Sequence, residues 1–177
     1  QIQAVLPLIE KYVYGYDEET LETAIGKLLK NAGKTLALAE SCSGGYISHL
    51  ITTVPGSSNY LRGTLVPYHN DLKEQLLGVS SATLTQHGAV SEETVREMAT
   101  GIKKLFGADF GLASSGIAGP DGGSPDKPVG TVWIACAGPY FVEARLLQLT
   151  QDRMINIQLT GVAVLNLLRI CFLKHNK

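Results

Sequence analysis

Apolar residues recur at helical and strand spacing along the chain, and they predict an alternation of helices and strands. Between Asp17 and Gly33, leucines, alanines and one isoleucine fall at helical spacing, so a helix is predicted there with Asp17 as its N-cap and Gly33 at its end. Short apolar runs of strand length occupy residues 35–39, 61–68, 108–113, 129–137 and 140–149. Further helices are predicted over residues 46–51, 70–77, 91–107 and 152–173.

The order of these elements indicates the fold class. Helices and strands alternate in the first two thirds of the chain, and the last two strands flank Gly138-Pro139, which predicts a hairpin. We therefore expect an α/β fold with one domain: a three-layer α/β/α sandwich with a mixed sheet, closed by a C-terminal β-hairpin and a long helix. The last predicted helix is apolar on more sides than a helix with one face exposed to solvent would be. It is expected to be central in the fold or to form an interface between copies, so a homo-oligomer is predicted.

Composition narrows the possible functions. The chain has 177 residues, of which 45% are hydrophobic and 18% charged, and its net charge is −1. Such balanced charge argues against direct nucleic-acid binding through bulk charge. The widely spaced Cys42, Cys136 and Cys171 form neither a disulfide framework nor a zinc motif, and they suit a reducing cytoplasm. The apolar run 159–173 is interrupted by polar residues and is too short to cross a membrane, and residues 1–17 lack the features of a signal peptide.

Two glycine-rich turns follow predicted strands, at residues 40–45 and 114–123. Because glycine lacks Cβ, backbone N–H groups in such turns can approach a phosphate or carboxylate closely. The alternative is that these glycines only shape tight turns. Glu40, beside the first turn, is either a general base or an acceptor for N–H groups of the loop. Cys42 in the same turn is interpreted as a small buried residue rather than a nucleophile.

A second group of chemically capable residues consists of Ser57, Ser58, Tyr68 and Lys73. A serine nucleophile needs a base, and a lysine with a lowered pKa or a proton-relaying tyrosine can serve. Spacing alone favours the simpler view that the serines belong to a turn after Pro55-Gly56 and that Lys73 is a solvated helix residue.

Two further residues, Ser115 and Arg153, have two possible roles each. Ser115 either binds a ligand or ends a strand. Asp152 is predicted to cap the last helix, and Arg153 is either a surface charge or a clamp for an anion. The histidines, cysteines and carboxylates show no spacing typical of a metal site, so no metal and no cofactor is expected.

Five motifs in order resemble one known family: AESCSGG at 39–45, VPGSS at 54–58, QHGAVSEET at 86–94, SGIAGPDGG at 115–123 and KPVGTVW at 127–133. They are similar to the C-terminal domain of the competence/damage-inducible CinA family, whose active members are nicotinamide-mononucleotide deamidases. The resemblance covers about residues 18–172. It implies a deamidase-like domain over 18–177 and, in 1–17, a connector from a preceding domain of a longer protein.

The resemblance also implies roles for individual residues. The family reaction converts nicotinamide mononucleotide to nicotinate mononucleotide and ammonia without a metal. Matched by motif, Ser58 becomes the nucleophile or water-orienting hydroxyl, and Tyr68 and Lys73 move protons. The residues expected to bind the substrate are Glu40, Ser41, Gly44, Gly45, Ser57, Ser115, Gly116, Gly119 and Arg153.

The chain departs from the family pattern at Pro67, His69 and Gln151. The departure at Gln151 removes a glycine two residues before Arg153. A competing hypothesis is therefore a nucleotide-binding or regulatory domain with weak catalysis, and a third is an interaction domain in competence or DNA repair.

Overall fold

A five-stranded mixed sheet forms the middle layer of the computed structural model, which describes Ile9 and residues 13–175. The strands are β1 (Leu36–Glu40), β2 (Leu61–Leu65), β3 (Phe110–Gly116), β4 (Thr131–Ala137) and β5 (Val142–Gln148), in the spatial order β2-β1-β3-β4-β5. Strand β1 pairs in parallel with both β2 and β3, whereas β4 runs antiparallel to β3 and to β5. The predicted mixed sheet and C-terminal hairpin are confirmed.

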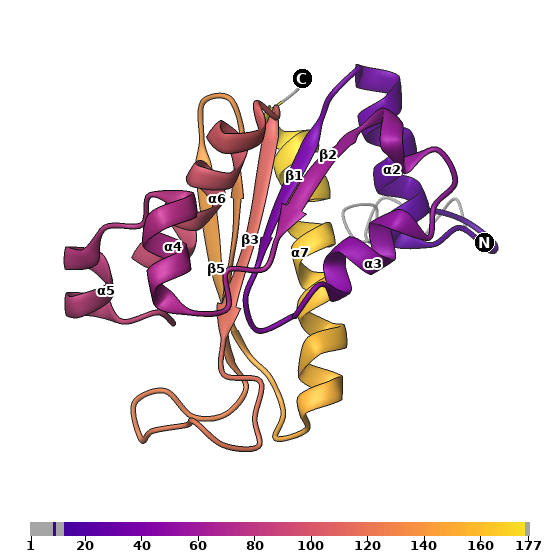
Figure 1. Cartoon of the computed structure of the whole chain (residues 1–177). Helices are drawn as coiled ribbons and strands as arrows, with labels where there is room; N and C mark the ends of the chain where they lie inside the picture. Colours follow the sequence, from indigo (N-terminus) through magenta and orange to yellow (C-terminus); the bar gives the residue numbers. More distant parts are fainter. Residues whose placement is uncertain (1–8, 10–12, 176–177) are drawn as a thin grey trace.

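Helices cover both faces of this sheet (Figure 1). Their bounds are α2 (Leu21–Ala32), α3 (Tyr46–Thr52), α4 (Asn70–Leu77), α5 (Ser81–His87), α6 (Glu92–Phe106) and α7 (Arg153–His175), and a 3₁₀ turn, η2, spans Ser57–Asn59. Helices α2, α3 and α7 pack on one face, and α6 packs on the other with α4 and α5 beside it. The three-layer α/β/α architecture expected from the sequence is therefore present.

The side chains of β1 show why the sheet is covered on both sides. Leu36 and Leu38 are fully buried in the core beneath α2, α3 and α7, while Ala37 and Ala39 are fully buried in the core beneath α6. Successive side chains of a strand point to opposite faces, so a continuous apolar run is needed where both faces are covered. The small alanines face α6, the helix that contacts β1, β3 and β4.

Helix boundaries agree with the sequence except at two places. The Ser91 hydroxyl accepts from the Thr94 N–H and Gly107 closes α6 in a left-handed conformation, as predicted. The predicted Asp17 cap is wrong, because α2 begins at Leu21 with the Thr20 hydroxyl accepting from the Thr23 N–H. Helix α5 was not predicted, because it buries no residue and so has no apolar periodicity.

The closing helix α7 is the core helix of its face. It packs on β3, β4, α2 and α3, and 56% of its most apolar 18-residue window is buried, although its length and composition alone would allow it to cross a membrane. Asp152 caps it through a bond from the Ile155 N–H to the Asp152 carboxylate (3.0 Å), as predicted. Most of the predicted connector 1–17 lies outside the described residues.

Candidate active site

A polar cavity of about 280 Å³ opens at the carboxyl ends of the three parallel strands. Its lining comes from the turn after β1, the end of the segment between β2 and α4, the first turn of α4, and the segment between α5 and α6. The end of β3 with the loop after it and the first residue of α7 complete it. The lining residues are Ser41, Cys42, Tyr68, Asn70, Lys73, Ala89, Val90, Ser115, Gly116, Ile117, Ala118, Gly119, Asp121, Gly122 and Arg153. In open α/β sheets, ligands bind at this edge, where chain connections leave to opposite sides.

Lys73 is the most unusual group in this cavity. It is 1% exposed, and its Nζ donates to the Pro67 carbonyl (3.0 Å) and the Tyr68 carbonyl (3.2 Å). It forms no ion pair with a carboxylate of the described residues. Burial lowers the pKa of Lys73, and the charges of Cys42 and Asp71 oppose this only in part. The expectation of a solvated surface lysine is therefore wrong.

The two bonds of Lys73 are compatible with a neutral amine as well as with an ammonium. A neutral amine has two N–H donors and one lone pair, whereas an ammonium has three donors and no lone pair. With two carbonyls as its acceptors, a neutral Lys73 satisfies both N–H groups and keeps the lone pair for a proton. A buried lysine in this state is suited to act as a general base.

Ser41 and Cys42 enter the cavity from the turn that follows β1. The Ser41 backbone N–H donates to the Ser114 carbonyl (3.0 Å), which ties this turn to the end of β3. The Ser41 hydroxyl makes no hydrogen bond within the described part of the chain, although it lines the cavity. Burial raises the pKa of the Cys42 thiol to about 12, so Cys42 is a poor nucleophile. The interpretation of Cys42 as a small buried residue is supported.

Arg153 and Tyr68 supply the charge and the phenol of the site. Arg153 donates to the Gly119 carbonyl (2.7 Å) and to the Tyr68 hydroxyl (3.2 Å). A guanidinium has five N–H donors, so three remain for an anion. The missing glycine at Gln151 does not move Arg153 away from the cavity.

Ser115, Gly116 and Gly119 line the cavity as expected, but the hydroxyl of Ser115 already has a partner. It donates to the Ala89 carbonyl (2.7 Å), in the segment between α5 and α6. Ser115 therefore joins two walls of the cavity. Gly119 has a φ of +95°, and a Cβ on it would lie 2.6 Å from a Val129 methyl group, so a larger residue does not fit.

Glu40 lies outside the cavity and stabilises the turn that leads into α3. One carboxylate oxygen accepts from the Ser43 hydroxyl (2.8 Å) and from the backbone N–H groups of Gly45 (3.0 Å) and Ile47 (3.0 Å). The other accepts from the Ser48 N–H (2.7 Å). Because Glu40 itself occupies these donors, they do not serve an external phosphate.

This arrangement decides between the two roles weighed for Glu40. It is an acceptor for N–H groups of its own loop, and the general-base alternative is not supported. Gly44 and Gly45 both have positive φ and shape the turn, and neither lines the cavity.

Ser57 and Ser58 are the predicted site residues that the structure places elsewhere. They form η2, before β2 begins, whereas Tyr68 and Lys73 follow the other end of β2. Neither serine lines the cavity. Within one chain, the five residues of β2 lie between Ser58 and the pair Tyr68 and Lys73, so the structure does not bring this predicted group together.

Besides Cys42, seven cavity residues were not among the predicted site residues: Asn70, Ala89, Val90, Ile117, Ala118, Asp121 and Gly122. Ala89 and Val90 carry no distinctive chemistry, and only their place between two helices brings them to the site. Asp121 stands in the second glycine-rich turn, so its carboxylate could have been included as a signal for a polar ligand. Among the residues that the structure describes, no group of three or more His, Cys, Asp or Glu could hold a metal ion.

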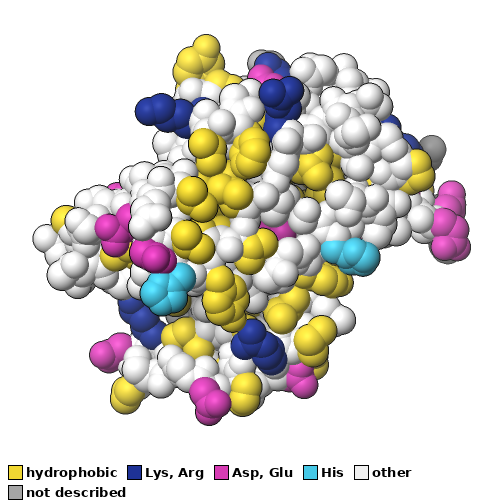
Figure 2. Space-filling model, in the orientation of Figure 1, with side chains coloured by type: hydrophobic (Ala, Val, Ile, Leu, Met, Phe, Trp, Pro, Cys, Tyr) yellow, Lys and Arg dark blue, Asp and Glu magenta, His cyan; other side chains and the backbone are white. Residues whose placement is uncertain are grey.

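Charges on the visible face are dispersed. Figure 2 shows lysine and arginine side chains separated from one another and interspersed with acidic ones, without a continuous basic stripe on the described part of this face. This distribution agrees with the near-neutral net charge of −1.

Comparisons with known proteins agree on one family. The family model of the CinA C-terminal domain matches residues 18–172. A CinA-like protein of Cytophaga hutchinsonii is 53% identical over 169 residues, which cover 96% of this chain and 40% of that protein. A second CinA-like protein, from Amoebophilus asiaticus, is 54% identical over 165 residues, which cover 93% of this chain and 40% of that protein. The chain thus spans about 40% of the length of these relatives.

Solved structures give the same result. The crystal structure of the competence/damage-inducible protein CihA of Agrobacterium tumefaciens matches with a TM-score of 0.84 and 35% identity, covering 90% of this chain and 98% of that one. A competence damage-inducible protein A of Klebsiella pneumoniae matches with a TM-score of 0.84 and 31% identity, covering 89% and 97%. The sequence motifs, the mixed sheet and the family match over 155 of the residues, from 18 to 172, lead to one conclusion: this chain belongs to the CinA C-terminal domain family.

Proposed function

We propose that this chain is an amidohydrolase that converts nicotinamide mononucleotide to nicotinate mononucleotide and ammonia. The observation that carries the proposal is Lys73, a buried lysine with two carbonyl partners and no carboxylate partner in the described chain, in the same cavity as the unpaired Ser41 hydroxyl. Acyl transfer from an amide requires a nucleophile and a base, and this cavity contains an available hydroxyl and a candidate base.

Ser41, rather than Ser58, is assigned as the attacking hydroxyl. Of the three hydroxyls in the cavity, that of Ser115 donates to the Ala89 carbonyl and that of Tyr68 accepts from Arg153. The Ser41 hydroxyl is the one without a partner among the described residues, and it shares the cavity with Lys73. Geometry thus supports a Ser41–Lys73 pair, whereas the family motif by itself had favoured Ser58.

The Ser41–Lys73 pair accounts for each proton transfer of the proposed reaction. Neutral Lys73 takes the Ser41 proton as the serine oxygen attacks the carboxamide carbon, and the resulting ammonium gives that proton to the leaving nitrogen, which departs as ammonia. A water molecule then attacks the acyl-serine ester with Lys73 as the base again. Lys73 returns the proton of that water to the Ser41 oxygen as the ester bond breaks, which restores the hydroxyl and neutral Lys73. The carboxylic acid formed ionises to nicotinate, and the released ammonia takes up that proton.

The remaining polar groups fit a charged mononucleotide. Arg153 keeps three N–H donors after its bonds to Gly119 and Tyr68, enough for a phosphate. The cavity of about 280 Å³ is close to the roughly 300 Å³ at which small-molecule sites begin. The three free thiols of the chain suit the cytoplasm as the place of this reaction.

Ammonia release from nicotinamide mononucleotide tests the proposal, with nicotinamide riboside as a substrate without phosphate. We expect the wild type to act on the mononucleotide and poorly on the riboside. S41A and K73M should each lower kcat by at least about 100-fold, which is the scale of a lost nucleophile or base. S58A is the matched control and should retain activity within a few fold.

Each alternative has its own outcome. Absence of ammonia release, together with a higher melting temperature in the presence of the mononucleotide, would support a binding or regulatory domain instead. Loss of activity in S58A with full activity in S41A would reverse the assignment of the hydroxyl.

A further inference from the structure

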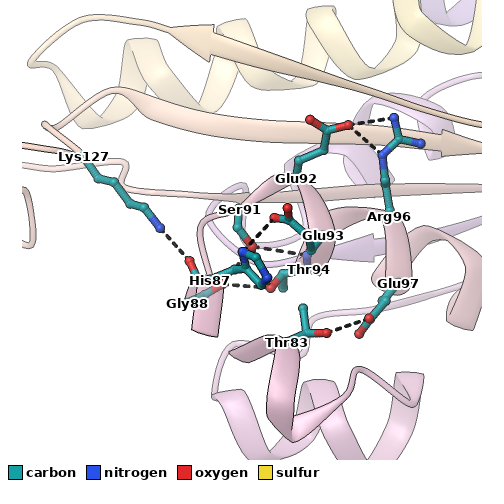
Figure 3. A network of polar contacts seen from close by, with 10 residues as sticks. All are labelled: Thr83, His87, Gly88, Ser91, Glu92, Glu93, Thr94, Arg96, Glu97 and Lys127. Carbon is teal, nitrogen blue, oxygen red and sulfur yellow. Dashed lines mark hydrogen bonds and ion pairs between the residues drawn. The ribbon is translucent and has the colours of Figure 1, made fainter. Parts of the chain in front are cut away.

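Three successive backbone carbonyls, at the last residue of α5 and the two residues after it, each accept a side-chain hydrogen bond from a different part of the fold. Figure 3 shows the first two of these sites, at His87 and Gly88. The His87 carbonyl accepts from Lys127 Nζ (2.7 Å). The Gly88 carbonyl accepts from the hydroxyls of Thr94 (2.8 Å) and Ser91 (3.0 Å), at the start of α6. The Ala89 carbonyl accepts from Ser115 at the end of β3. These bonds fix the backbone immediately before Ala89 and Val90, which line the cavity.

The bonds from Ser115 and from Lys127 both join walls of the cavity that are far apart in sequence, and the bond from Lys127 starts from the loop rather than from the strand. Lys127 belongs to the loop between β3 and β4, and His87 stands 40 residues earlier, at the end of α5. The same loop carries Gly119, Asp121 and Gly122, which line the cavity on the other side. Gly88 has a φ of +77°, which favours glycine, and a Cβ placed on it would lie at ordinary contact distance, 3.6 Å, from Lys127 Nζ.

The loop itself is held at defined points. Its base is closed by reciprocal bonds, from the Ile117 N–H to the Thr131 carbonyl (2.9 Å) and from the Gly130 N–H to the Ile117 carbonyl (2.8 Å). Its tip is a turn in which the Ser124 N–H donates to the Lys127 carbonyl (2.9 Å) and the Lys127 N–H donates to the Ser124 hydroxyl (3.1 Å). Lys127 thus stands at the edge of a preformed turn, and its side chain ties that turn to the opposite wall.

We propose that Lys127 is a positioning residue, which fastens the β3–β4 loop to the segment between α5 and α6 and so holds the cavity in its ligand-binding shape. It lies outside the cavity lining, so it acts through the two walls rather than by touching the substrate. The inference rests on the proposed function for its substrate, nicotinamide mononucleotide, but the fastening itself is a property of the free protein.

The expected effect follows from the kind of bond. A hydrogen bond from an ammonium to a carbonyl stabilises by more than one between neutral groups, and its loss leaves the loop to be ordered when the ligand binds. We expect K127M to raise KM for nicotinamide mononucleotide about tenfold and to change kcat less than threefold, because Lys73 and Ser41 are held by other contacts. K127R retains donors at this position and should restore KM to within about threefold of the wild type.

A second lysine gives a matched control. Lys103 on α6 donates to the Gly138 carbonyl (2.6 Å) in the β4–β5 turn, so it too donates from an ammonium to a backbone carbonyl, at a less exposed position away from the cavity. K103M should leave KM unchanged. Amide hydrogen exchange of the free protein supplies a readout that needs no substrate: K127M should speed exchange about tenfold in both 118–126 and 88–90, and K103M in neither.

Three outcomes separate the hypotheses. Faster exchange in both segments with a raised KM supports the proposal. Unchanged exchange in K127M, or a KM no different from that of K103M, overturns it. If the wild type neither binds nor hydrolyses the mononucleotide, the proposed function fails, while coupled exchange in the two segments would still support the fastening role.

Discussion

Replacing Glu40 with glutamine removes the charge at the centre of the turn between β1 and α3 without changing the size of the side chain. Glu40 is fully buried, and its two oxygens accept four hydrogen bonds, three on one oxygen and one on the other. The carboxylate also faces the positive end of the α3 dipole. The substitution therefore tests whether an internal carboxylate, rather than a bound anion, organises this turn.

The structure sets the size of the effect. A glutamine would place its NH₂ group where the oxygen with one bond now lies, because the opposite orientation would break three bonds instead of one. The Ser48 N–H then loses its acceptor and faces a donor, which costs about 1–3 kcal/mol. The other three bonds pass from a charged to a neutral acceptor and weaken by roughly 0.5–1 kcal/mol each. Since burying a neutral amide costs less than burying a charge, we expect a net loss of about 3 kcal/mol.

Urea unfolding followed by circular dichroism measures this loss. E92Q is the matched control, because Glu92 is a more exposed carboxylate at the start of α6 that pairs with Arg96, and such pairs contribute less than about 1 kcal/mol. A loss below about 1 kcal/mol in E40Q, with an unchanged slope in urea, would refute the assignment of the four bonds as the stabilising feature of this turn.

Three further predictions address stability and reactivity. The buried Tyr60 hydroxyl has no hydrogen-bond partner among the described residues, so Y60F should be neutral or should stabilise the protein by up to about 1 kcal/mol. The same hydroxyl would lie 2.9 Å from a Cβ on Gly26, so Y60F should also reduce the loss of stability caused by G26A, in a double-mutant cycle measured by urea unfolding. Hydrogen bonds from Lys174 and then His175 lower the pKa of Glu143 from 4.5 to about 2. The resulting stabilisation is complete above pH 4.5 and is lost as the pH falls towards 2, so in E143Q the melting temperature should depend less on pH across that range. Because burial raises the pKa of Cys42 to about 12, its alkylation by iodoacetamide at pH 8, followed by peptide mass spectrometry, should be more than about 100-fold slower than that of a free cysteine.

Much of the fold is predictable from local patterns in the sequence. The Ser91 cap, the glycine ends of α2, α4 and α6, and the apolar run of β1 are all encoded within a few residues, because capping and side-chain alternation depend on near neighbours in sequence. Helix α5 was missed for the same reason, since it buries no side chain that would leave a periodic signal.

The sequence by itself determined the family, the α/β class and the chemical identity of Tyr68, Lys73, Ser115 and Arg153 as candidates, because motifs and periodicity are local properties of the chain. Only the tertiary structure decided which of them meet. It turned Lys73 from an apparently solvated residue into a buried base candidate, since the walls around it come from segments far apart in sequence. It also separated Ser58 from the cavity by the length of β2 and placed Ser41 there instead, because a strand carries its two ends to opposite edges of the sheet.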